Sequence, residues 1–225
     1  TNDYYGYIRS MGTLCYRVGE KDSCETICEE AQRIQAFISQ GQGSPGFGSG
    51  SISASPVGKC TYTGSKYPAD RVNKILSAAY AAGIKTNVGL AAVVGNALVE
   101  SKDNGIDLNP QALNEAGGDF GIFQWTGIRQ EALKGYAQSN GADYRNMDTQ
   151  MAFFRLELTG KSVSPSSNRT YSDYVPTVAA VNSARNIEQA TAAFADQYEK
   201  PANKTSYPIR TDYAKEILAG MTCSG

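Results

Sequence analysis

The chain of 225 residues has an ordinary globular composition, with 41% hydrophobic and 19% charged residues, and its length suits one large domain or one medium domain with an appendage. The net charge of −1 and the isoelectric point of 5.6 argue against the basic surface that nucleic-acid binding requires. No run of apolar residues approaches the roughly 18 that a membrane-spanning helix needs, so no membrane span is predicted.

Histidine is absent, which excludes the nucleophilic triads and the common zinc sites that need an imidazole. We expect no metal and no cofactor, so that any chemistry depends on carboxylates, tyrosines, lysines or thiols. The five cysteines favour disulfides in an oxidising compartment; they are Cys15, Cys24, Cys28, Cys60 and Cys223. A bridge between Cys60 and Cys223 would clamp the two ends of the central region, although five cysteines permit many connectivities. A zinc site that includes Cys24 and Cys28 is a weaker interpretation, because their spacing is unusual.

The first part of the chain divides into an extension and a linker. Residues 1–39 contain a predicted helix from Asp22, where Asp22 and Glu25 have the spacing of a capping box. Residues 40–58 are dense in glycine and serine, which is typical of a flexible linker. We therefore expect a cysteine-containing extension over 1–39, a linker over 40–58 and the main domain over 59–225.

Two helices are predicted next, over residues 67–83 and 86–100. The first carries apolar residues at helical spacing and ends at a glycine that suits a C-terminal cap. Thr86 or Asn87 can cap the second helix, which is strongly apolar and ends on Glu100. A carboxylate at the end of so apolar a helix costs free energy unless it is paired, protonated or used in chemistry.

The rest of the chain alternates between a loop region and further helices. Residues 101–126 are rich in Asn, Asp, Gly and Pro before the apolar "FGIFQW", which predicts loops and a short β-hairpin. Helical periodicity then resumes at residues 127–139, 148–158, 174–181, 186–198 and 208–218. The sequence therefore predicts a mainly α fold of five to seven helices with one small β-hairpin.

Several segments occur in the order seen in the phage-tail lysozyme-like domains, which are peptidoglycan-cleaving modules of the lysozyme superfamily. They are "GLAAVVGNALVES", "LNPQALNEAGGDFGIFQWTGIRQEAL", "TQMAFFRLEL" and "ATAAFADQYEKP". The resemblance covers roughly residues 68–220, and its most specific parts are "GIFQWTGIR" and the pair Gly95 and Asn96 shortly before Glu100. It implies an α+β lysozyme-like fold in which the hairpin lines a glycan-binding cleft. The first 60 residues carry no resemblance.

The resemblance and the local chemistry both point to Glu100 as the catalytic acid. Glycan strands are cut when a carboxylic acid protonates the glycosidic oxygen, so that acid must keep its proton near neutral pH. The negative end of a helix dipole and apolar neighbours both disfavour the charged form at such a position. The alternative is an exposed glutamate at a helix end, paired with Lys102 or Lys85, but the surrounding motif favours catalysis.

A second catalytic carboxylate is expected in the region after Glu100, which contains Asp103, Asp107, Glu115 and Asp119. Asp119 is the first choice, because it lies in "GGDFGIFQW", where the hairpin of the resembling family lines the cleft. The family pattern does not demand an acid there, and Asp119 is equally well a turn aspartate beside two glycines. A transglycosylase needs no second protein carboxylate, so hydrolase and lytic transglycosylase both stay open.

Four further residues are expected to bind the substrate or to orient Glu100. The amide of Gln124 can bond an acetamido group and the indole of Trp125 can stack on a sugar ring, although Trp125 equally suits a packing role. Asn96 lies one helical turn before Glu100 and either orients its carboxyl group or satisfies buried backbone groups. Ser101 follows Glu100 and either orients it or simply ends the helix.

The sequence thus predicts a muramidase-type enzyme that cuts peptidoglycan glycan strands between N-acetylmuramic acid and N-acetylglucosamine. A glucosaminidase that cuts the other glycosidic bond is a further possibility. The competing hypothesis is a non-catalytic glycan-binding or assembly module that retains the fold. The expected location is extracellular or in the cell envelope, as a secreted lysin or as part of a phage particle or a secretion or conjugation apparatus. Residues 1–39 would then bind a partner, cover the cleft or assist assembly.

Overall fold

The computed structural model describes most of the chain after residue 51; the described stretches are 52–103, 105–114, 118–160, 171–201 and 204–224. Residues 51–225 form one compact unit. The expected extension over 1–39, with its helix from Asp22 and three of the cysteines, lies outside the described residues, as does most of the expected linker.

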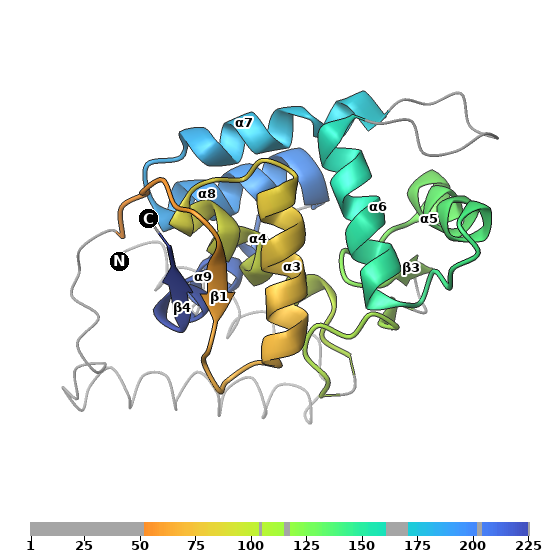
Figure 1. The fold of residues 1–225 in the computed structure, drawn as a ribbon, viewed down its shortest axis with the longest axis horizontal. Helices are drawn as coiled ribbons and strands as arrows, with labels where there is room; N and C mark the ends of the chain where they lie inside the picture. Colours follow the sequence, from red (N-terminus) through yellow and green to blue (C-terminus); the bar gives the residue numbers. More distant parts are fainter. Residues whose placement is uncertain (1–51, 104, 115–117, 161–170, 202–203, 225) are drawn as a thin grey trace, which may run out of the picture. The chain divides into compact units, whose positions relative to one another are not determined.

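Within the described stretches, seven α-helices form most of the structure (Figure 1). They are α3 (Ala69–Ala81), α4 (Asn87–Glu100), α5 (Gly127–Ser139), α6 (Met147–Thr159), α7 (Pro176–Ser183), α8 (Ile187–Phe194) and α9 (Tyr207–Ala219). A 3₁₀-helix, η1 (Tyr171–Tyr174), precedes α7, and a π-helical turn, η2 (Ala195–Glu199), continues α8. The predicted mainly α fold class is therefore confirmed. None of the described helices is long and apolar enough to cross a membrane.

Two small antiparallel sheets accompany the helices; they pair β1 (Cys60–Tyr62) with β4 (Met221–Cys223) and β2 (Leu113–Asn114) with β3 (Asp119–Phe120). The second sheet is the predicted hairpin, with only two residues in each strand. In the first sheet Cys60 lies opposite Cys223, and the two form the predicted disulfide. This bridge joins the beginning and the end of the helical unit.

Helix α4 is the centre of the fold and packs against α3, α8 and α9, as Figure 1 shows. All residues from Val88 to Leu98 are buried, because neighbouring elements enclose the helix on every side. Thr86 caps its start, where its hydroxyl oxygen accepts a hydrogen bond from the Gly89 N–H at 3.1 Å. The helix ends at Glu100, as predicted, so this carboxyl group lies where the core meets solvent.

Two predicted helices differ from the observed ones. The sequence predicts a single helix over residues 174–181, but η1 ends at Tyr174 and α7 starts at Pro176. A proline suits this position because its missing N–H would be unpaired in the first turn in any case. The predicted helix over 186–198 ends as an α-helix at Phe194 and widens into the π-helical turn η2.

Residues 52–58, the last part of the predicted linker, form backbone hydrogen bonds with the helical region. The Ala54 N–H donates to the Arg185 carbonyl and the Val57 N–H donates to the Lys85 carbonyl, both at 2.9 Å. The last part of the expected linker is therefore held against the helices by backbone hydrogen bonds.

Candidate active site

Glu100 is paired with a buried arginine rather than with a surface lysine. Its side chain is 20% exposed, and the Nη2 of Arg210, in the first turn of α9, donates to its Oε1. The Arg210 side chain is only 3% exposed. The Nζ of Lys102 instead lies 3.7 Å from the Oδ1 of Asp107. The Nζ of Lys85 donates a hydrogen bond to the Tyr80 carbonyl at 2.8 Å. A carboxylate at the end of an apolar helix is expected to be paired, protonated or used in chemistry, and the structure shows that Glu100 is paired with Arg210.

Asn96 fixes the position of Arg210, the arginine that is paired with Glu100. It is fully buried, and its Oδ1 accepts a hydrogen bond from the Nη1 of Arg210 at 2.9 Å. Its Nδ2 donates to the Ala92 carbonyl at 2.9 Å, while Ser206 Oγ accepts from the Nε of Arg210 at 3.0 Å. Asn96 therefore bonds a buried backbone carbonyl, which is one of the two roles expected for it, and it also contacts the arginine that is paired with Glu100.

Gly95 lets α9 approach α4 closely enough for this contact. A Cβ atom at Gly95 would lie 2.6 Å from the Arg210 carbonyl oxygen and 2.7 Å from the Ala214 backbone nitrogen. Backbone atoms cannot yield as the end of a flexible side chain can, so a larger residue would push the two helices apart. The matched motif thus has a physical explanation, since Gly95 admits α9, Asn96 fixes Arg210, and Glu100 pairs with it.

Glu199 is a second carboxyl group near this site, and the sequence patterns predict no role for it. It is the last residue of η2, and its Oε1 is buried and accepts no hydrogen bond from the described residues. Burial raises the pKa of Glu199 well above its usual value and the charge of Glu100 raises it further, whereas Arg129 and Arg210 lower it. Burial thus favours the neutral, protonated form of Glu199. Its signal in the sequence is its place in the matched segment "YEKP".

Glu157 of α6 is fully buried and organises a second network that the sequence patterns do not predict. It accepts hydrogen bonds from Trp125 Nε1 at 2.9 Å, from Arg129 Nε at 2.8 Å and Nη2 at 3.0 Å, and from the Tyr198 hydroxyl at 2.5 Å. Four donors compensate the buried charge. Trp125 is 0% exposed, so neither face of its indole is open to a sugar. This geometry corresponds to the packing role considered for Trp125.

The remaining predicted site residues lie on the loop and hairpin after α4. Ser101 is buried, and its hydroxyl donates to a backbone carbonyl one turn earlier at 2.6 Å. Gln124 is half-buried, has a positive φ of 44°, and donates to two backbone carbonyls at 3.0 and 3.3 Å. Asp119 is half-buried on β3, where its Oδ2 accepts from Asn114 Nδ2 at 3.1 Å. All of these bonds are to groups other than Glu100.

The other acidic residues considered for a second carboxylate have partners in the loop. Asp103 accepts a hydrogen bond from Asn109 Nδ2 at 3.3 Å, and Asp107 pairs with Lys102. Both contacts are local, as expected for residues that stabilise a loop. Glu115 lies outside the described residues.

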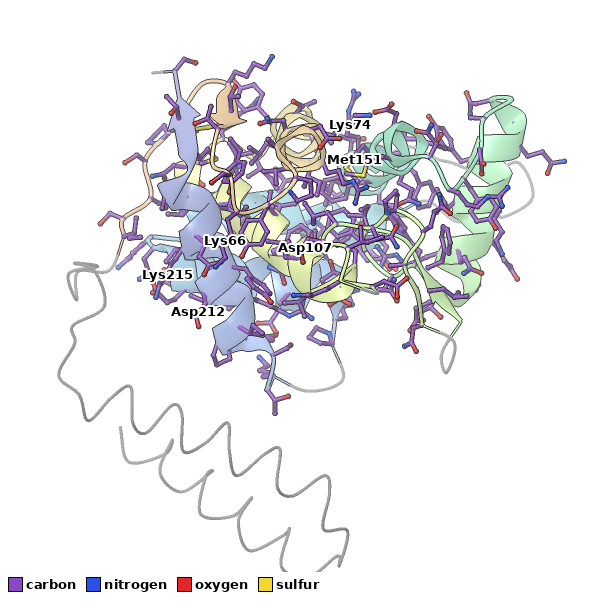
Figure 2. The ribbon with its side chains drawn as sticks, turned by 90° about the horizontal axis from the view of Figure 1, so that it is seen from below. Lys66, Lys74, Asp107, Met151, Asp212 and Lys215 are labelled. Carbon is purple, nitrogen blue, oxygen red and sulfur yellow. A yellow bond between two sulfur atoms is a disulfide. The ribbon has the colours of Figure 1, made fainter. Side chains whose placement is uncertain are left out.

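A groove of about 390 Å³ lies between α3 and α6. Its lining includes Lys74 and Met151, which Figure 2 labels, and Asp148, whose Oδ1 lies 2.7 Å from the Lys74 amine. None of the predicted site residues lines this groove, so it adds nothing to the argument for Glu100.

Comparison with protein families matches residues 71–221 to the family described as phage tail lysozyme. The match spans about two thirds of the chain and includes Glu100, Glu199 and Arg210. A comparison with curated proteins finds no significant match. The chain therefore belongs to the phage tail lysozyme family, a membership that implies lysozyme-like, peptidoglycan-cleaving activity.

Proposed function

We propose that the chain is a peptidoglycan muramidase that cuts between N-acetylmuramic acid and N-acetylglucosamine, with Glu100 as the general acid. The observation that supports this most is the setting of Glu100, a partly exposed carboxyl group fixed by a buried arginine at the end of the central helix. A catalytic acid must reach the glycosidic oxygen and keep one orientation. The 20% exposure of Glu100 and its contact with Arg210 meet these two requirements.

In the proposed reaction, Glu100 donates its proton to the glycosidic oxygen while the bond from that oxygen to the sugar carbon breaks. The sugar passes through an oxocarbenium-like transition state, and the bonding electrons stay on the leaving oxygen. Glu100 is then a carboxylate whose charge Arg210 compensates. Because Asn96 and Ser206 fix Arg210, the carboxyl group keeps its place before and after proton transfer.

Asp119 is the proposed second carboxylate, which would activate water or stabilise the charged sugar. Its place on the hairpin supports this role, since the hairpin of lysozyme-like domains lines the cleft. Gln124 follows on the same segment and is proposed to bind an acetamido group. A lytic transglycosylase is the second candidate, because its substrate supplies the attacking hydroxyl and needs no second protein carboxylate.

The test is digestion of purified peptidoglycan by the full chain and by the Glu100→Gln variant, with the products identified by mass spectrometry. The parent should release fragments that end in reducing muramic acid. The Glu100→Gln variant should be slower by at least about 100-fold, because it removes general-acid catalysis. Glu131→Gln is the matched control, since Glu131 is exposed on α5, and it should keep the parental rate.

Each other outcome assigns a different function. Anhydro-muramic ends would make the protein a lytic transglycosylase, and a parental rate for Asp119→Asn would then free Asp119 from any role. A folded parent that cleaves nothing would favour the non-catalytic glycan-binding module. Undiminished cleavage by Glu100→Gln would point to a different acid.

A further inference from the structure

Gln150 of α6 is fully buried, and its side chain bonds to backbone groups of three separate segments. Its Nε2 donates to the Pro110 carbonyl at 2.7 Å and to the Tyr144 carbonyl at 3.0 Å. Its Oε1 accepts a hydrogen bond from the Ile122 N–H at 3.0 Å. The two carbonyls need donors and the N–H needs an acceptor, so the amide fits in one orientation only. Gln150 thus fixes the loop before the hairpin and the turn after β3 relative to α6.

Pro110 connects Gln150 to the end of α4. Asn109, the preceding residue, donates its N–H to the Ser101 carbonyl at 3.0 Å. Ser101 follows Glu100 directly, and both its hydroxyl and its N–H donate to a carbonyl of α4. The segment that Gln150 holds through Pro110 is therefore bonded to the residue beside the proposed acid.

Gly121 connects Gln150 to Gln124. The Gly121 carbonyl and the Ile122 N–H belong to the same peptide unit, and Gln150 bonds to its N–H side. The carbonyl side accepts from the Gln124 N–H at 3.2 Å and from the Gln124 Nε2 at 3.0 Å. Gly121 has a φ of +82°, and a Cβ there would lie 2.8 Å from the Gln150 Oε1. Only glycine allows this peptide unit to lie against the Gln150 amide.

The amide of Gln124 is oriented by these bonds. Its Nε2 meets two carbonyl oxygens, that of Gly121 and that of Ala112 at 3.3 Å, so its Oε1 is the other end of the amide. This Oε1 accepts no hydrogen bond from any residue that the structure describes. Gln124 also has a positive φ of 44°, a strained conformation that persists where the surroundings enforce it. The half-buried side chain therefore presents one fixed acceptor.

We propose that Gln150 is a positioning residue for substrate recognition, which fixes the Gln124 amide relative to Glu100 so that the Gln124 Oε1 accepts the N–H of a substrate acetamido group. The inference rests on the proposed function, in which Gln124 binds the acetamido group and Glu100 is the acid. Gln150 acts from a buried position through the Gly121–Ile122 peptide unit and has no contact with substrate.

The test compares the full chain with the Gln150→Met, Gln124→Met and Gln150→Met/Gln124→Met variants, with KM and kcat measured on soluble peptidoglycan fragments. Methionine is close to glutamine in length but has no amide. Each single variant should raise KM by about five- to tenfold, as expected when one hydrogen bond to the substrate is lost. The kcat should change little, because Arg210 holds Glu100 without Gln150. The double variant should have the KM of Gln124→Met alone, because Gln150 acts through Gln124.

Asn73→Leu is the matched control for a merely structural role. Asn73 of α3 is also an amide that bonds two backbone groups, since it accepts from the Tyr62 N–H at 2.7 Å and donates to the Tyr62 carbonyl at 3.0 Å. Like Gln150→Met, it should lower the thermal unfolding temperature, but it should keep the parental KM below that temperature. Gln150→Asn withdraws the amide by one methylene group and should raise KM by less, and it serves if Gln150→Met does not fold.

The outcomes separate the inference from the proposed function. A parental KM for folded Gln150 variants or for Gln124→Met would overturn the positioning role. So would single effects on KM that multiply in the double variant, or an equal rise in KM for Asn73→Leu. If Glu100→Gln is inactive in the same assay, such a result refutes the positioning role alone. If Glu100→Gln cleaves at the parental rate, the proposed function is refuted as well.

Discussion

Glu157 shows how single residues of this protein depend on complete pairing. Its carboxylate has no contact with solvent, so its charge is stabilised by donors from Trp125, Arg129 and Tyr198. Burial raises the pKa of Tyr198 well above its usual value, so the hydroxyl remains a donor throughout the physiological range. Removing one donor leaves a buried charge with less compensation, which is more costly than the loss of an ordinary hydrogen bond.

The first prediction concerns Trp125. Trp125→Phe removes the Nε1 donor and leaves space beside Glu157, so the free energy of unfolding should fall by about 2–4 kcal/mol. The folded variant should still cleave peptidoglycan with an unchanged KM, because the indole of the parent is inaccessible to sugar. Denaturant unfolding and cleavage assays below the transition measure the two effects. Parental stability with a raised KM would instead establish the sugar-stacking role.

At the scale of elements, the site is made by the packing of α4 against α9. Gly95 lies where α9 comes closest, and Arg210 extends from the first turn of α9 toward Asn96 and Glu100. The distance between the two helix axes therefore decides whether the guanidinium reaches the carboxyl group. The same helix pair thus serves both the core and the proposed chemistry of Glu100.

We expect Gly95→Ala to lower both the free energy of unfolding and the rate of peptidoglycan cleavage. Its Cβ would lie 2.8 Å from the Ala214 Cβ as well as against the α9 backbone, so the helices must separate. Overpacking of this kind costs about 1–3 kcal/mol, and the cleavage rate should fall because Arg210 moves away from Glu100. Gly135→Ala, within α5, is the matched control and should be neutral or stabilising, since alanine is the better helix former. A Gly95→Ala variant with parental stability and rate would contradict the close-packing argument.

At the scale of the helical unit, the disulfide closes the chain on itself. Cys60 and Cys223 are 163 residues apart in sequence, and they join β1, which precedes α3, to β4, which directly follows α9. A cross-link over so long a loop stabilises mainly by restricting the unfolded chain. It also holds the end of α9, the helix that carries Arg210.

The double variant Cys60→Ser/Cys223→Ser should therefore lose about 2–5 kcal/mol of unfolding free energy. A reducing agent should destabilise the parent by a similar amount and leave the double variant unaffected, which separates this bridge from the other cysteines. The folded double variant should keep its cleavage rate below its own unfolding transition, since the bridge does not touch Glu100. Equal stability of parent and double variant in denaturant unfolding would contradict the prediction.

The sequence by itself determined most of the elements and singled out Glu100 as the proposed centre of the site. Helical periodicity and capping residues predict α4 with Thr86 before it and Glu100 at its end, and they place α5 over 127–139 as observed. These signals act within a few residues, so they are readable without the fold. The family motif points to Glu100 as the proposed acid in the same way, and the positions of Cys60 and Cys223 at the two ends of the helical region predict the disulfide that is observed.

Only the tertiary structure decided the partners of these residues. Arg210 is 110 residues from Glu100 in sequence, and no local pattern says that α9 packs against α4 closely enough for the two to meet. The burial of Trp125 against Glu157 and of Glu199 at the end of η2 likewise depends on how the helices pack against one another. Periodicity reports which face of a helix is apolar, whereas the charge that a carboxylate meets is set by elements far away in the chain, and that charge decides its chemistry.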